Sequence, residues 1–369
     1  MAVYTLLQKD VKSAHHRNGE ISCYVGEVPA FVESGLIRLY RHPHSSLQFF
    51  TTSRPTDNVC TYVVHQGDQP TTIFVFQYKD GLVTVFNEFI VVSAEEVNRF
   101  ARYIFDAFPD VSTIRFEALQ TDADSFPFPY QRHNSKEDWV IELPSSAEEY
   151  TARLGKSTRN NIKYDVRRLS RVFPDHSLRF YTGAEIDEAH VRAIVGLSDA
   201  RISAKKKRFG IDDQEVERII RFARKGGLVS VLHIDGRLCA GMICQIVGSA
   251  YMAEVIAHDP AYNEYRLGAL CYYRTICEAI ARGATTVYMG GGREPYKARF
   301  LGVRQDMDRL ELYRSRASMA LNLRRVARMA IGGGLRKAKI WLLAREKSAL
   351  TRSVFFGLIL ARRLRDRLR

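Results

Sequence analysis

The sequence predicts a mixed α/β (α+β) protein in two halves, each a mixed, mostly antiparallel sheet flanked by helices, followed by a basic helical tail. An Asp-Gly dipeptide lies between β-rich runs in each half and indicates a hairpin. Residues 315–369 hold 15 Lys and Arg against two acids, whereas the rest of the chain is almost neutral at +1. We therefore expect domains at residues 1–145, 146–314 and 315–369.

The first half is expected to contain a hairpin, a helix and further strands. Asp80-Gly81 suits the positive φ angles of a type I′ turn, and β-rich runs at 72–79 and 82–89 lie on either side of it. The other expected elements are a helix at 94–108, strands at 111–116 and 139–143, and a polar, proline-containing loop at 121–136.

The second half is expected to place helices before a three-stranded meander. The basic helix 147–172 is predicted to be interrupted near Ser157-Thr158, and Asp212 resembles the start of a capping box for helix 213–225. The remaining expected elements are a helix at 186–204, strands at 228–234, 238–247 and 250–257, a helix at 267–282, a strand at 285–289, a short helix from Pro295 and a strand at 310–313. We expect Gly332–Gly334 to divide the tail into two amphipathic helices.

Composition excludes several classes of protein. No signal peptide and no apolar run of about 20 residues is visible, so we expect neither export nor a membrane span. The six cysteines have no CxxC spacing, which favours buried free thiols in a reducing, cytoplasmic compartment and argues against a metal site. The GxSxG, HExxH, Walker and GxGxxG motifs are missing from the sequence.

The most informative stretch is residues 285–302. A short β-branched strand ends at Gly290–Gly292, and a short helix carrying Tyr296 follows. Because glycine has no side chain, such a cluster lets the backbone lie close to a ligand, with the tyrosine beside it. The alternative is a βα turn in which the glycines serve backbone geometry alone and Tyr296 packs in the core.

The order of elements in the second half resembles that of the GNAT acetyltransferases. In that superfamily the fourth strand, here 251–258, lies beside an acyl-CoA, and the next helix offers its N-terminus to the pyrophosphate. The superfamily loop usually reads Gln/Arg-x-x-Gly-x-Gly/Ala, and this chain has Tyr265-x-x-Gly268-x-Leu270, so only the central glycine matches. The alternative is a helix N-terminus with a tolerated glycine.

The resemblance also implies roles for individual residues. Tyr296 matches the tyrosine that protonates the departing thiolate, whose thiol has an ordinary pKa of about 8.5. Glu254, or a water that it holds, is the candidate base and His258 is the other candidate; each could instead be structural. The expected acyl-CoA contacts are Val255, Ile256, Arg266, Gly268, Ala269 and Gly292, and the expected substrate contacts are Arg293, Lys297 and Arg159.

Two segments, 290–302 and 156–169, resemble more narrowly the FemAB-like and CelD-type acetyltransferases, which are associated with cellulose or exopolysaccharide synthesis. This resemblance covers roughly residues 145–315 and implies that the N-terminal third is a degenerate first GNAT-like half. It implies an N- or O-acyltransferase that uses acetyl-CoA or another acyl-CoA, with a small-molecule, sugar or amine acceptor and no metal.

Two other interpretations remain open. Fem transferases use aminoacyl-tRNA, and the altered loop at 265–270 together with the basic helix 156–171 would suit RNA, although no long coiled-coil arm is visible in the second half. Alternatively, the protein is a non-catalytic peripheral module on the inner face of a membrane. Its tail, with Trp341, Phe355 and Phe356, would then lie on an anionic lipid surface.

Overall fold

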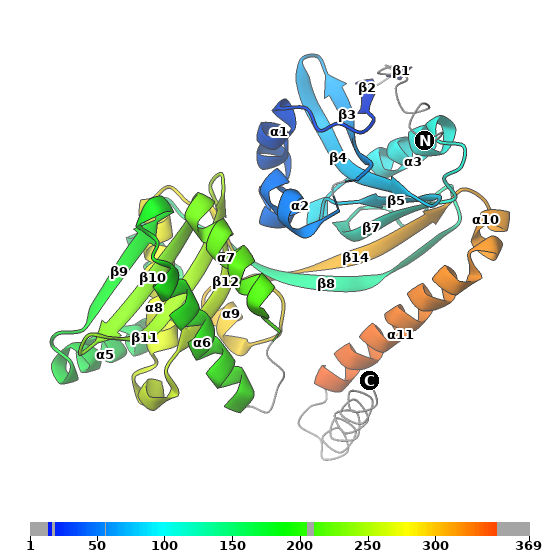
Figure 1. Cartoon of the computed structure of the whole chain (residues 1–369). Coiled ribbons are helices and arrows are strands. Elements are labelled where there is room, and N and C mark those ends of the chain that lie inside the picture. The colour runs from blue at the N-terminus through cyan, green and yellow to red at the C-terminus, as the bar shows by residue number, and fades with distance from the viewer. Residues whose placement is uncertain (1–13, 17–18, 56, 205–209, 345–369) are drawn as a thin grey trace.

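The strands of the protein form a single sheet that runs through both halves (Figure 1). The computed structural model describes residues 14–16, 19–55, 57–204 and 210–344. The strand order is β1-β2-β3-β4-β5-β7-β14-β8-β13-β12-β11-β10-β9, with β6 paired to β7. Most neighbours are antiparallel, and the parallel pairs are β5–β7, β6–β7 and β12–β13. The predicted mixed α/β class is therefore confirmed.

The first half places helices on both faces of its strands. Helices α1 and α2 cover one face around Phe50 and Ile73, and α3 covers the other around Phe74 and Phe100. Its elements are β1 (Ala14–His16), β2 (Gly19–Tyr24), α1 (Phe31–Tyr40), η2 (Pro43–Ser45), α2 (Leu47–Ser53), β3 (Val59–Gln66), β4 (Gln69–Lys79), β5 (Leu82–Val85), β6 (Ile90–Val91), α3 (Ala94–Ala107) and β7 (Thr113–Gln120).

The second half repeats this layering. Helices α6 and α7 lie on one face, whereas α4, α5 and α8 lie on the other with the short helix α9 (Figure 1). Its elements are α4 (Ala147–Arg153), α5 (Lys156–Val172), β9 (Ser177–Thr182), η3 (Gly183–Glu185), α6 (Glu188–Ala204), α7 (Asp213–Gly226), β10 (Gly227–Ile234), β11 (Arg237–Val247), β12 (Ala250–His258), η4 (Pro260–Tyr265), α8 (Leu267–Ala281), β13 (Thr286–Tyr288) and α9 (Pro295–Arg299).

Predictions of turns and helix caps that depend only on neighbouring residues are confirmed. Asp80-Gly81 and Asp235-Gly236 have positive φ at all four residues and join β4 to β5 and β10 to β11. The Asp212 side chain accepts the Glu215 N–H and caps α7. The expected break in the basic helix is present, but it lies at residues 154–155.

Two long strands, β8 (Tyr130–Glu142) and β14 (Val303–Tyr313), join the halves. Strand β8 pairs with β14 over most of its length and with β13 at its end, and β14 also pairs with β7. The prediction of a loop at 121–136 is therefore wrong for residues 130–136, and the last strand begins before Leu310. Pairing on both sides supplies the hydrogen bonds of these polar segments, and such pairing is not encoded in local composition.

The tail folds as α10 (Arg316–Leu321) and α11 (Leu323–Ala344), and α11 runs back beneath β8 (Figure 1). The predicted division at Gly332–Gly334 is wrong, because α11 continues through all three glycines. A Cβ at Gly333 would meet the His133 side chain of β8 at 3.1 Å, so glycine permits the close contact here. Phe355 and Phe356 lie outside the described residues.

Candidate functional site

Strands β12 and β13 run side by side over only three residue pairs. Ala250–Met252 pairs with Thr286–Tyr288, after which β13 ends while β12 continues to His258. A β-bulge lies in this distal part of β12: Ala253 and Val255 pair with consecutive residues of β11, so Glu254 is the extra residue. The pairing between the two strands therefore ends where we expect the acyl group to lie.

The turn after β12 leads into the N-terminus of α8. Arg266 occupies the N-cap position in the left-handed region, at φ 51°, and no side chain caps the helix there. The N–H groups of Ala269 and Leu270 donate to the Arg266 carbonyl. Helical geometry leaves the N–H groups of Leu267 and Gly268 without an intrahelical partner, and the helix dipole adds positive potential. This end of α8 suits an anion.

Gly268 accommodates a histidine ring. A Cβ at this position would lie 2.8 Å from Nδ1 of His258, so a side chain there would displace the imidazole. Nε2 of His258 lies 2.9 Å from Oδ1 of Asn263, and because that carbonyl oxygen only accepts, the imidazole donates. The other ring nitrogen, Nδ1, faces Gly268.

Tyr296 lies on the same side of the sheet as Gly268. Its ring packs edge-on against Tyr272 of α8, with 5.9 Å between the ring centroids, next to the core that α5 and α8 cover. Burial raises the pKa of the Tyr296 hydroxyl, and Glu294 adds to this effect. The hydroxyl therefore stays protonated at neutral pH, as a general acid requires.

Glu254 lies on the opposite face, toward α7. Its carboxylate pairs with Arg218 at 2.6 Å and accepts the side-chain amide of Gln245 at 2.7 Å. Burial raises the pKa of the Glu254 carboxyl, and Arg218 partly opposes that shift. Its neighbours on β12 serve the core: Val255 packs beneath α6 and α7, and Ile256 packs on the other face.

The glycine turn, Gly290–Gly292, is held by side-chain donors from α9 and β8. Lys297, which is 2% exposed, donates to the carbonyl of Gly290 at 2.7 Å and to that of Gly291. Trp139 Nε1 donates to the Gly292 carbonyl at 2.7 Å. Gly292 has φ 101°, where L-residues are strained, so this position needs glycine.

Three other predicted site residues are arginines. Arg159 donates to the carbonyls of Ala152 and Leu154 and so closes the end of α4. Arg266 lies 3.9 Å from Asp165 and is more than half exposed beside the α8 N-terminus. Arg293 lies 3.5 Å from Glu137 of β8, away from that terminus.

Sequence reasoning missed a set of polar residues at the junction between the halves. His42 is buried and lies 3.2 Å from the buried Asp138, and its ring contacts Phe89 and Tyr288. Glu88, also buried, pairs with Lys136 and with the half-buried Arg54. These pairs cannot be predicted from a short stretch of sequence, because their members are separated by up to 96 residues.

All six cysteines are unpaired, five of them buried, as the sequence predicts. Within the described residues, no three His, Cys, Asp or Glu side chains gather closely enough to hold a metal ion. Across the same residues, no helix has both the length and the apolar character needed to cross a membrane.

The chain is similar to known proteins in part of its sequence and in its fold. Residues 156–298 match the family model described as an acetyltransferase (GNAT) domain. The solved structure of FemX is similar, with a TM-score of 0.57 at 10% identity, covering 84% of this chain and 99% of that one. The structure of L-PGS from Bacillus licheniformis gives a TM-score of 0.50 at 12% identity, covering 82% and 96%. At sequence identities of 10% and 12%, these similarities show a shared fold. No curated protein sequence matches the chain.

Proposed function

We propose that this chain, whose residues 156–298 match the model of a GNAT acetyltransferase domain, is an acyl-CoA-dependent N- or O-acyltransferase. One observation carries the proposal. Where β12 and β13 diverge, the uncapped end of α8 and the hydroxyl-bearing Tyr296 lie on the same side of the sheet. An anion site and a proton donor are thus near one strand edge, as transfer from a diphosphate-bearing thioester requires.

In the proposed complex, the acyl-CoA lies along distal β12 at Val255 and Ile256, near Gly292. Backbone N–H groups of the strand edge polarise the thioester carbonyl. The diphosphate binds the N–H groups of the first turn of α8 at Gly268. Arg266, exposed beside that turn, adds a positive charge. Ala269 would act through packing, because its N–H donates to Arg266.

The chemical step uses two side chains on opposite faces. The acceptor nitrogen or oxygen attacks the carbonyl carbon, and Glu254, directly or through a water, takes the proton that the acceptor releases. The C–S bond then breaks, and the Tyr296 hydroxyl gives its proton to the leaving thiolate. The raised pKa of Glu254 favours proton acceptance, although its ion pair with Arg218 must loosen first. His258 is the second candidate base.

Ligand-induced thermal stabilisation tests the donor. Acetyl-CoA, longer acyl-CoAs and tRNA would be titrated separately, and a donor that binds only the folded state raises the melting temperature as its concentration rises. We expect stabilisation by an acyl-CoA. Stabilisation by tRNA alone would replace the proposal with aminoacyl transfer, and no response to any of the three would contradict both.

The proposed setting is cell-envelope or exopolysaccharide biosynthesis at the cytoplasmic face of a membrane. Helix α11 exposes Ile331, Leu335 and Trp341, each more than half accessible, among basic residues. Exposed apolar side chains between cations suit an anionic lipid surface.

Vesicle co-sedimentation tests this surface with the full chain. We expect binding to vesicles with anionic lipid, lost in Ile331→Glu/Leu335→Glu and retained in the control Leu321→Gln, which changes an exposed leucine of α10. Equal binding of both variants, or equal binding to neutral vesicles, would contradict it.

A further inference from the structure

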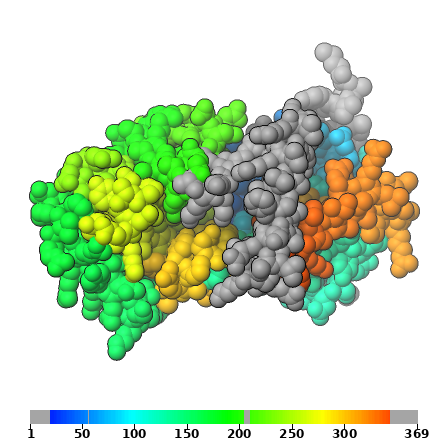
Figure 2. Space-filling model, turned by 90° about the horizontal axis from the view of Figure 1, so that it is seen from below, coloured from blue at the N-terminus to red at the C-terminus, as the bar shows by residue number. Residues whose placement is uncertain are grey.

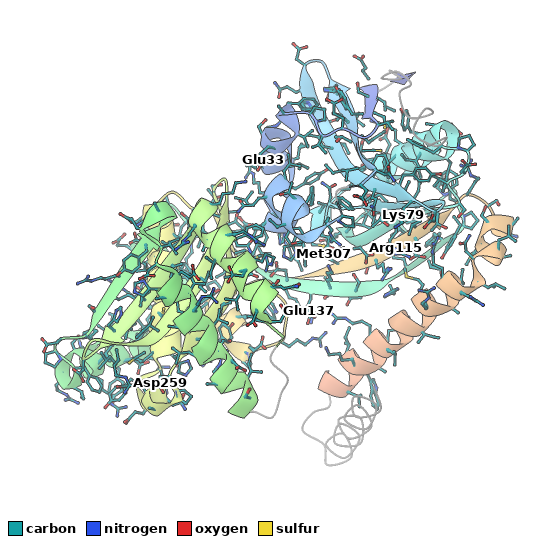
Figure 3. The ribbon with its side chains drawn as sticks, viewed as in Figure 1. Glu33, Lys79, Arg115, Glu137, Asp259 and Met307 are labelled. Atoms are coloured by element: carbon teal, nitrogen blue, oxygen red, sulfur yellow. The ribbon has the colours of Figure 1, made fainter. Side chains whose placement is uncertain are left out.

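A cavity of about 430 Å³ lies at the junction between the two halves. The glycine turn, the middle of β8, the η2 segment and helix α11 line it, with Gly291, Gly292, Lys136, Glu137, Arg336 and Lys339 among the lining residues. Glu137 marks its position in Figure 3, well away from Asp259, which begins the turn before α8. Residues of β12, η4 and α8 do not line the cavity, so it is separate from the proposed diphosphate site.

The cavity carries an excess of positive charge. Lys136 is neutralised by the buried Glu88. Among the described residues, this leaves Arg293, Arg336 and Lys339 against one lining carboxylate, Glu137. Oε2 of Glu137 lies 3.5 Å from Arg293 Nε and 3.6 Å from Arg336 Nη2. Neither approach is a hydrogen bond: all three atoms are buried without a hydrogen-bond partner in the described part of the chain. Two guanidinium donors are thus held in place but unsatisfied.

The backbone of the glycine turn adds to this potential. Lys297 and Trp139 donate hydrogen bonds to the carbonyl oxygens of residues 290–292, and neither residue lines the cavity. A trans peptide holds its N–H opposite its C=O, so the N–H groups of Gly291, Gly292 and Arg293 point away from Lys297 and Trp139. Backbone donors and guanidinium groups together favour an anion.

We infer that this cavity binds a phosphoryl group of the acceptor, so that the acceptor is a phosphate-bearing small molecule. Two unbalanced positive charges match a phosphate dianion, and arginine forks pair with its oxygens in a bidentate manner. The glycine turn leads directly into α9, which places the bound acceptor near Tyr296. Figure 2 shows α9 and α11 on the same side of the molecule. The role as acceptor site rests on the proposed acyl transfer, whereas the anion site itself does not.

Calorimetric titration of the full chain with inorganic pyrophosphate, at constant ionic strength, tests the site. We expect saturable binding that Arg336→Gln/Lys339→Gln weakens by about tenfold or more. The matched control Arg328→Gln/Lys337→Gln removes two charges from the same helix outside the cavity and should bind as the wild type does. Lys339→Gln alone changes an exposed side chain, so its weaker binding would not reflect misfolding. Malonate, a dicarboxylate, should bind less tightly than pyrophosphate.

Two experiments with acetyl-CoA distinguish this anion site from the proposed acyl-CoA site. Pyrophosphate should bind equally well after saturation with acetyl-CoA, and Arg336→Gln/Lys339→Gln should leave acetyl-CoA binding unchanged. Loss of the pyrophosphate site on acetyl-CoA saturation would assign it to the acyl carrier and overturn the inference. So would equal weakening by both double variants, or no saturable binding. If acetyl-CoA fails to bind while the pyrophosphate results hold, the proposed donor is wrong and the anion site stands.

Discussion

Lys297 illustrates how one residue can organise a turn. Its ammonium group is buried, which lowers the pKa of Lys297, and it lies 3.6 Å from Glu294. It donates to two consecutive glycine carbonyls, so those oxygens are turned away from the cavity at the junction. The resemblance to known transferases predicts that Lys297 contacts the substrate. Its contacts instead suit a positioning role, in which it holds the backbone that meets the ligand.

Lys297→Met should therefore destabilise the glycine turn. Methionine keeps the volume of the side chain but leaves the carbonyls of Gly290 and Gly291 without their donor. We expect the free energy of unfolding to fall by about 1–3 kcal/mol. Hydrogen exchange should accelerate in residues 290–293, and Lys225→Met, at an exposed helix end, is the control. Unchanged exchange in the turn would contradict this role.

Tyr296→Phe separates catalysis from packing at the same residue. Phenylalanine retains the edge-on contact with Tyr272, so the melting temperature should stay close to that of the wild type. Loss of the proton donor should lower kcat by about 10²-fold, measured as thiol release from acetyl-CoA with a phosphate-bearing sugar or amine acceptor. Glu254→Gln should also lower kcat. If both variants turned over at the wild-type rate, the assigned roles would be wrong.

Helix α11 shows how an element departs from its local sequence. Three consecutive glycines lower helix stability by about 1 kcal/mol each relative to alanine, which explains the prediction of two helices. The structure keeps one helix because it packs against β8, where Gly333 meets His133 and Met329 is buried. Packing against β8 thus outweighs the local helix preference of the three glycines.

The three glycines should respond differently to substitution. A Cβ at Gly334 meets nothing within 4 Å, so Gly334→Ala should stabilise the protein by about 0.5–1 kcal/mol through helix propensity. Gly333→Leu should lower the melting temperature, because its side chain must displace His133 or α11. Thermal unfolding followed by circular dichroism measures both. The same sign of change for both variants would show that α11 does not dock on β8 in solution.

At the scale of the whole molecule, β8 and β14 make the two halves one structure. Strand β14 pairs with β7 of the first half, β8 pairs with β13 of the second half, and the two strands pair with each other, with a polar network at the junction beside them. His44 belongs to this network with His42, Glu88, Lys136, Arg54 and Arg218 around it. Burial holds the pKa of His44 well below its usual value of 6.5, and its cationic neighbours act in the same direction.

The junction should therefore be sensitive to acid. The unfolded chain takes up a proton at His44 as pH falls through about 6.5, whereas the folded protein resists it, so stability decreases as pH falls. Urea unfolding at pH 7.5 and pH 5 measures this loss. His44→Gln should show a smaller loss than the wild type, although His42, whose pKa is also lowered by burial, retains part of it. If the wild type and His44→Gln lost the same free energy of unfolding between pH 7.5 and pH 5, the acid sensitivity would come from groups other than His44.

The sequence alone determined what depends on neighbouring residues. Both Asp-Gly hairpins, the Asp212 cap, the order of strands β10 to β12 and the position of Tyr296 after the glycines follow from local geometry and side-chain periodicity. The resemblance of the second half to the GNAT acetyltransferases has its counterpart in the domain match over residues 156–298.

The tertiary structure decided what depends on distant residues. It made a strand of residues 130–136, kept α11 continuous, and brought Arg336 to Glu137 across about 200 positions of sequence. The physical reason is that strand pairing and ion pairing across the sheet gain their free energy from partners that no local window contains.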